Sequence, residues 1–203
     1  MKTIIAKALF NSHSYLEYRK LVSDLLTEQK STGLEQTEAL TQYSKLNDTR
    51  MSRLDKTIKI IPECSVHLET LKKEYIWVVL SEGWCGDAAQ IVPILHKMAL
   101  VSNGKIDLKI VLRDENDALM NLFLTNNTRS IPKLIIIDKE TTSVLGDWGP
   151  RPEGALDLIK EYKKKYGEIN EEAKTELQLW YLHDKGVSVQ KEITAMMASF
   201  DHL

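Results

Sequence analysis

A single cysteine, Cys85, lies where the sequence changes from a strand pattern to a helical one. Residues 75–80 form a short apolar run rich in β-branched and aromatic residues, which is typical of a strand buried on both faces. Helical character follows over residues 86–102. Unpaired backbone N–H groups and the positive end of the dipole at a helix start favour a thiolate, the reactive form of cysteine. This position by itself predicts a lowered pKa for Cys85.

Asp87 opposes that effect. Its carboxylate would repel a thiolate two residues away and raise the thiol pKa. It also stands in the first helical turn, where a carboxylate stabilises a helix, and we favour this structural role. Whether the pKa of Cys85 is raised or lowered overall stays open at this point. Cys64, the other cysteine, is either an ordinary small residue, which we favour, or a remote partner, and two cysteines make no disulfide framework.

The elements that must position Cys85 alternate along the middle of the chain. We expect strands over residues 75–80, 106–112, 133–138 and 143–148, and helices over 62–73, 86–102, 114–124 and 152–166. The last two strands are close enough to form a hairpin, and the first two need a right-handed crossover through a helix. This order predicts an α/β fold, a small mixed sheet between helices.

Helical patterns also occupy both ends of the chain, over residues 14–30, 37–58, 171–185 and 188–200. We therefore divide the chain into a helical N-terminal extension (1–55), a central domain (56–166) and a helical C-terminal extension (167–203). The apolar stripe of the last helix (Ile193, Met196, Met197 and Phe200) is interpreted as packing surface. The terminal helices either pack on the central domain or form a dimer face, so the oligomeric state stays open.

Four segments in the central domain resemble the thioredoxin family in order and spacing: 84–86 (Trp-Cys-Gly), Pro93, 130–133 (Ser-Ile-Pro-Lys) and 147–150 (Asp-Trp-Gly-Pro). The resemblance implies a thioredoxin-like mixed sheet with a cis peptide bond before Pro132. That proline and its neighbour Ile131 would face Cys85 and hold the backbone of a partner chain. The loop around Gly149 would close the same site. The chain most resembles a bacterial thioredoxin-like group that carries Trp-Cys-Gly-Asp, a stretch like 149–152, and helical additions at both ends.

Two departures from the family pattern exclude the ordinary dithiol cycle. The second cysteine is replaced by Ala88, so Cys85 has no neighbouring thiol to resolve a mixed disulfide. The family's buried acid is replaced by Val79. What remains is a monothiol that exchanges with an external thiol or senses oxidants as a sulfenic acid. The alternative is a redox-inactive module that binds a peptide or protein. Glu82, three residues before the cysteine, argues against a peroxiredoxin-type peroxidase, which has Thr or Ser there.

The expected site consists of Cys85 as the nucleophile with a set of lining residues: Trp84, Gly86, Asp87, Ala88, Ile131, Pro132, Trp148, Gly149 and Arg151. Trp84 either shields the thiol or packs structurally, and Trp148 belongs either to the core or to the rim of the site. Arg151 and Arg129 either supply charge for a carboxylate or small thiol, or stay solvated, which we favour.

Composition and spacing limit the partners. The formal net charge of −2 argues against nucleic acid, and no apolar run approaches the roughly 18 residues that span a bilayer. No histidine pair has metal-ligand spacing with a cysteine, and no glycine-rich phosphate loop is present, so we expect no metal and no cofactor. The expected partner is a protein or small molecule that carries a thiol or disulfide. With no signal-peptide pattern at the start, the expected location is cytoplasmic.

Overall fold

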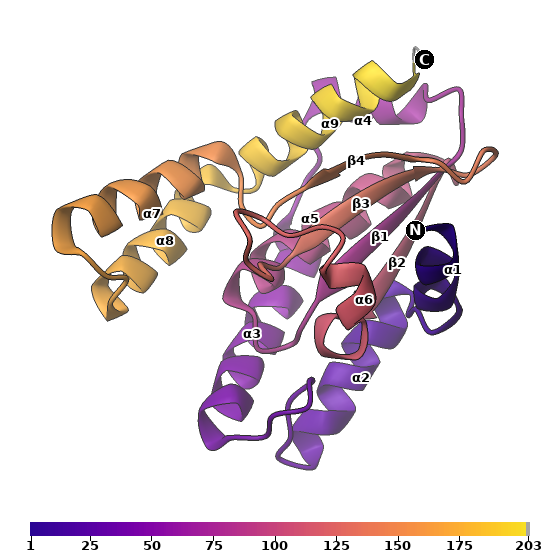
Figure 1. The fold of residues 1–203 in the computed structure, drawn as a ribbon. Coiled ribbons are helices and arrows are strands. Elements are labelled where there is room, and N and C mark those ends of the chain that lie inside the picture. The colour runs from indigo at the N-terminus through magenta and orange to yellow at the C-terminus, as the bar shows by residue number, and fades with distance from the viewer. Residues whose placement is uncertain (202–203) are drawn as a thin grey trace.

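The computed structural model describes residues 1–201 and has a four-stranded mixed sheet at its centre (Figure 1). The strands are β1 (Tyr75–Ser81), β2 (Ile106–Leu112), β3 (Lys133–Asp138) and β4 (Val144–Trp148), in the order β2-β1-β3-β4. β1 and β2 are parallel, and β1–β3 and β3–β4 are antiparallel. The expected α/β fold and the β3–β4 hairpin are confirmed.

β1 occupies the interior of the sheet and leads directly to the cysteine. Trp77, Val79 and Leu80 on this strand are fully buried, as expected for a strand covered on both faces. After β1 the chain makes a short turn and enters α5 (Gly86–Val101), with Cys85 as its N-cap residue. α5 lies behind the sheet in Figure 1 and α6 (Asp117–Met120) lies in front of it. The layered arrangement therefore sets Cys85 at the end of an interior strand.

The N-terminal helices are α1 (Lys2–Phe10), α2 (Tyr15–Thr27) and α3 (Glu38–Thr57). Ser14 caps α2 in a capping box and Thr37 caps α3, so both helices begin at the residues that their sequences favour. α1 was not expected from the sequence, and it buries Ile5 and Ala8 in the same core as the sheet. The first 57 residues thus pack on the sheet and on α5.

One predicted helix is wrong in its extent. Residues 114–124 were expected to be helical throughout, but they contain only the end of a 3₁₀ turn, η1 (Arg113–Glu115), and the four-residue α6. Asn116 interrupts them with non-helical dihedral angles, while its side-chain amide donates to the carbonyl of Leu112. This local side-chain bond competes with helix formation.

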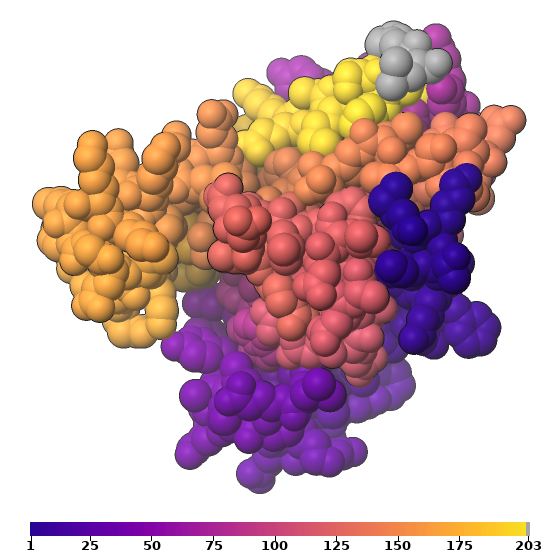
Figure 2. Space-filling model, in the orientation of Figure 1, coloured from indigo at the N-terminus to yellow at the C-terminus, as the bar shows by residue number. Residues whose placement is uncertain are grey.

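Three helices follow the sheet: α7 (Glu153–Tyr166), α8 (Glu171–Asp184) and α9 (Val187–Asp201). Figure 2 shows the α7–α8 pair as a lobe projecting from the rest of the molecule. α9 packs on α5 and on α4 (Pro62–Glu69), and Ile193 and Met197 are fully buried, which confirms the packing stripe. Within residues 1–201 no helix is long and apolar enough to cross a membrane.

Candidate functional site

The sulfur of Cys85 lies between the start of α5 and the loop before β3. Its Sγ donates to the carbonyl oxygen of Ile131 at 3.4 Å and accepts from the backbone N–H of Ala88 at 3.5 Å. The Ile131–Pro132 peptide bond is cis. The structure therefore brings the cysteine against the Ile-Pro segment that the thioredoxin resemblance implied.

Cys85 is a buried thiol with only 8% of its surface exposed. Its pKa is raised to about 12, first by burial and then by the Asp87 carboxylate, against the lowering effects of the Ala88 and Asp87 N–H groups and of Arg151. The lowered pKa expected from the helix start alone is thus wrong. Desolvation of the sulfur outweighs the favourable helix end, so at neutral pH the sulfur is protonated and able to donate to Ile131.

Asp87 is the centre of a buried polar triad. Its Oδ1 accepts from the hydroxyl of Tyr181 at 2.9 Å, and its Oδ2 pairs with Nη2 of Arg151 at 2.7 Å. The side chains of Arg151 and Asp87 are only 23% and 10% exposed. The triad joins α5 to α8 and to the loop after β4, so Asp87 does more than stabilise its own helix. Arg151, expected to be solvated, is instead the counterion of a buried carboxylate.

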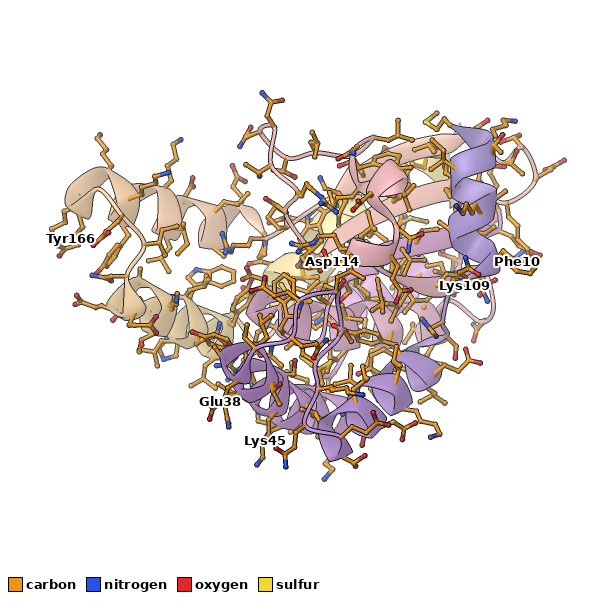
Figure 3. All side chains as sticks on the ribbon, turned by 60° about the horizontal axis from the view of Figure 1, so that its bottom comes forward. Phe10, Glu38, Lys45, Lys109, Asp114 and Tyr166 are labelled. Atoms are coloured by element: carbon orange, nitrogen blue, oxygen red, sulfur yellow. The ribbon has the colours of Figure 1, made fainter. Side chains whose placement is uncertain are left out.

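The residues before Cys85 are held by a second set of contacts. Glu82 is fully buried and its Oε1 accepts from the N–H of Asp114, which is labelled near the middle of Figure 3. Burial raises the pKa of Glu82. Trp84 is half-buried, with the guanidinium of Arg113 4.7 Å from the centre of its ring. Sequence reasoning did not identify Glu82 as a buried acid, because the buried acid of the thioredoxin family lies at the position of Val79.

The loop after β4 closes against the cis-proline segment. Gly149 has a φ of +115°, and a Cβ there would lie 2.3 Å from the carbonyl oxygen of Pro132. Trp148 is 9% exposed and its indole N–H donates to Glu192 on α9 at 2.8 Å, so this tryptophan belongs to the core rather than to a rim. Arg129 pairs with Asp117 on the surface, whereas the partner of Asp87 is Arg151.

A cavity of about 420 Å³ opens beside this site, between α3, the start of α5 and α8. Figure 2 shows the surface hollowed where the α7–α8 lobe approaches α3. The lining includes four residues expected at the site (Trp84, Gly86, Asp87 and Arg151), and it excludes the other six: Cys85, Ala88, Ile131, Pro132, Trp148 and Gly149. The candidate site therefore has two parts, a buried thiol and an adjacent open cavity.

α3 contributes residues that sequence reasoning did not connect to the site. The amide of Asn47, fully buried, donates to the carbonyl of Gly83 at 2.9 Å, and its Oδ1 accepts from Arg50 Nη1 at 2.8 Å. A polar residue on the buried face of a helix was the only available signal, because nothing in the sequence relates α3 to the turn after β1. Helix α3 thus forms one wall of the cavity.

Residues 33–163 match the family model described as thioredoxin, which covers more than half of the chain, and the protein belongs to that family. No curated protein matches the chain. It is similar to the crystal structure of a protein of unknown function from Pseudomonas aeruginosa, with 17% identity, a TM-score of 0.59, and coverage of 92% of this chain and 98% of that one. It is also similar to the crystal structure of an HIV epitope scaffold, with 17% identity, a TM-score of 0.57, and coverage of 92% and 99%. At this identity, these likenesses show the fold alone.

Proposed function

We propose that this protein is a binding module of the thioredoxin family, in which Cys85 stays protonated and the adjacent cavity receives a peptide segment of a partner protein. The observation that carries the proposal is the state of the thiol. Its pKa is raised to about 12 and its proton is engaged by the carbonyl of Ile131. Because the thiolate is the nucleophile, such a sulfur is unreactive at neutral pH.

The flanking helices support the same function. α3 and α8 stand on two sides of the cavity and leave an opening lined by Trp84, Tyr43 and Leu46. Tyr43 and Leu46 are 43% and 49% exposed, and exposed apolar side chains beside a cavity are typical of a protein-binding surface. These walls favour stable binding of a peptide segment and its side chains over the transient contact that disulfide exchange requires.

A second candidate is monothiol exchange, favoured by the placement of Sγ against the cis Ile131–Pro132 bond. In this reaction the Cys85 thiolate would attack a disulfide of a partner protein or a small molecule. A mixed disulfide forms as the partner's other sulfur leaves as a thiolate, and an external thiol then displaces Cys85. The finer likeness, to the bacterial group with Trp-Cys-Gly-Asp, is part of either proposal, and so is a cytoplasmic setting, with which two free cysteines agree.

The two functions differ in how Cys85 reacts with iodoacetamide as pH changes. In a Cys64→Ser background we expect slow alkylation at pH 7 and a rate that still rises above pH 9, because the thiol pKa is raised. Asp87→Asn removes a negative charge next to the sulfur, so it should lower the pKa and speed alkylation at pH 8 about tenfold. Rates from intact-mass spectrometry measure both effects.

Tyr181→Phe is the matched control for Asp87→Asn. It removes the hydrogen bond that Tyr181 donates to Asp87 but keeps the negative charge next to the sulfur, so alkylation should stay close to the wild-type rate. Faster reaction in both variants would mean local opening rather than a pKa change. A wild-type rate that levels off near pH 7, together with a mixed disulfide formed with a small disulfide, would overturn the binding module in favour of monothiol exchange.

The binding half of the proposal is tested by selecting displayed random peptides on the protein. Thr175→Trp, on the exposed part of the cavity wall, should fill the cavity and abolish binding of the selected peptides. Leu179→Trp introduces the same side chain one turn along α8, outside the cavity lining, and should leave binding unchanged. Peptides that bind Thr175→Trp as tightly as the wild type would exclude this cavity as the binding site.

A further inference from the structure

Within residues 1–201, the charged side chains around the cavity leave one cation without a counterion. Arg50, Arg151 and Lys174 face the cavity together with two acids, Asp87 and Glu171. Asp87 pairs with Arg151 at 2.7 Å and Glu171 pairs with Lys174 at 2.6 Å. Both acids are therefore already engaged, and among residues 1–201 no carboxylate pairs with Arg50.

Arg50 is held in place rather than free to turn into solvent. Its Nη1 donates to Asn47, which in turn is bonded to Gly83, so the guanidinium is anchored to the turn before Cys85. The same Nη1 lies 3.7 Å from the position that a Cβ would take at Gly86. The side chain is half-buried, and burial and the nearby Arg53 both lower its pKa, as expected for a cation whose surroundings offer no opposite charge.

The remaining walls of the cavity are apolar and aromatic. They come from Leu40, Tyr43 and Leu46 on α3, Trp84 before α5, and Leu177 on α8. A cavity of about 420 Å³ is within the range of ligand pockets, which combine apolar walls with a few polar groups that orient the ligand. The volume suits one or two side chains of a peptide.

We propose that the cavity binds the carboxylate of an acidic peptide residue flanked by apolar residues, with Arg50 as the counterion. The inference rests on the proposed binding function and specifies which chemical groups the bound peptide carries. A guanidinium that pairs with no carboxylate of residues 1–201 forms strong charge-assisted hydrogen bonds to a ligand carboxylate, while Tyr43, Trp84 and Leu177 contact the neighbouring apolar side chains. An anionic ligand also balances the surplus positive charge of the lining.

The test uses two blocked peptides, acetyl-Leu-Glu-Leu-amide and acetyl-Leu-Gln-Leu-amide, titrated to millimolar concentration. Binding is followed by NMR at the Gly86 amide and the Trp84 indole N–H. We expect the glutamate peptide to bind wild type about tenfold or more tightly than the glutamine peptide. Arg50→Gln should remove this preference, and Arg50→Lys should retain part of it.

Arg53→Gln is the matched control, since Arg53 lies one turn further along α3 and lines a different cavity. It should leave the preference intact. Equal binding of both peptides to the wild type overturns the carboxylate inference while the binding function stands. Binding of neither peptide also overturns it, and the display selection with Thr175→Trp then decides the binding function separately.

Discussion

Arg151→Ala is expected to destabilise the protein by about 3 kcal/mol or more, because it leaves the Asp87 carboxylate buried without its counterion. The hydroxyl of Tyr181 still donates to that carboxylate, but a single neutral donor does not replace a guanidinium. The free energy of unfolding from urea denaturation at pH 7 measures the effect.

Arg129→Ala tests whether burial is the cause. The Arg129–Asp117 pair is also an arginine–aspartate contact, but its side chains are 41% and 66% exposed. Exposed pairs contribute about 0–1 kcal/mol, so this variant should unfold at nearly the wild-type urea concentration. Equal losses in the two variants would show that the buried triad contributes no more than a surface ion pair.

Gly149→Ala is the second substitution with a large expected effect, about 3 kcal/mol or more. The new Cβ would lie 2.3 Å from the backbone oxygen of Pro132, and the backbone at Gly149 has a positive φ of +115°. Neither segment can yield without moving the loop that contacts Cys85. We therefore expect lower stability and, at pH 8, faster alkylation of Cys85.

Gly104→Ala separates the backbone strain of this substitution from the steric clash. Gly104 also has a positive φ, +84°, but nothing lies within 4 Å of a Cβ there. This variant should lose only about 1 kcal/mol of stability, which is the effect of placing a side chain at a positive φ. Alkylation of Cys85 should be unchanged. Similar losses for the two variants would mean that the Pro132 contact relaxes easily.

The two expected effects share a structural origin. Both arise in the loop after β4, which contacts the start of α5 through Arg151 and the Pro132 segment through Gly149. These contacts would limit how far the site changes shape, and such preorganisation would lower the entropic cost of the proposed peptide binding.

Local sequence patterns determined most of the elements and the position of the cysteine. The apolar run over 75–80 and the helical character after it predicted β1 and α5 within a residue or two, since strand and helix preferences are short-range properties. The resemblance of the Trp-Cys-Gly and Ile-Pro segments to thioredoxins implied in addition that Cys85 lies against Pro132. The exceptions were α1, which was not expected, and 114–124, where the side chain of Asn116 donates to the carbonyl of Leu112 and the helix is interrupted.

Only the tertiary structure decided what the cysteine can do. The thiol pKa depends on how completely the sulfur is buried, and the role of Asp87 depends on Tyr181 and Arg151, which are distant along the chain. The unpaired charge of Arg50 likewise emerges only when α3 and α8 close around the turn after β1. Desolvation and ion pairing are set by neighbours in space, so no pattern of nearby residues contains them.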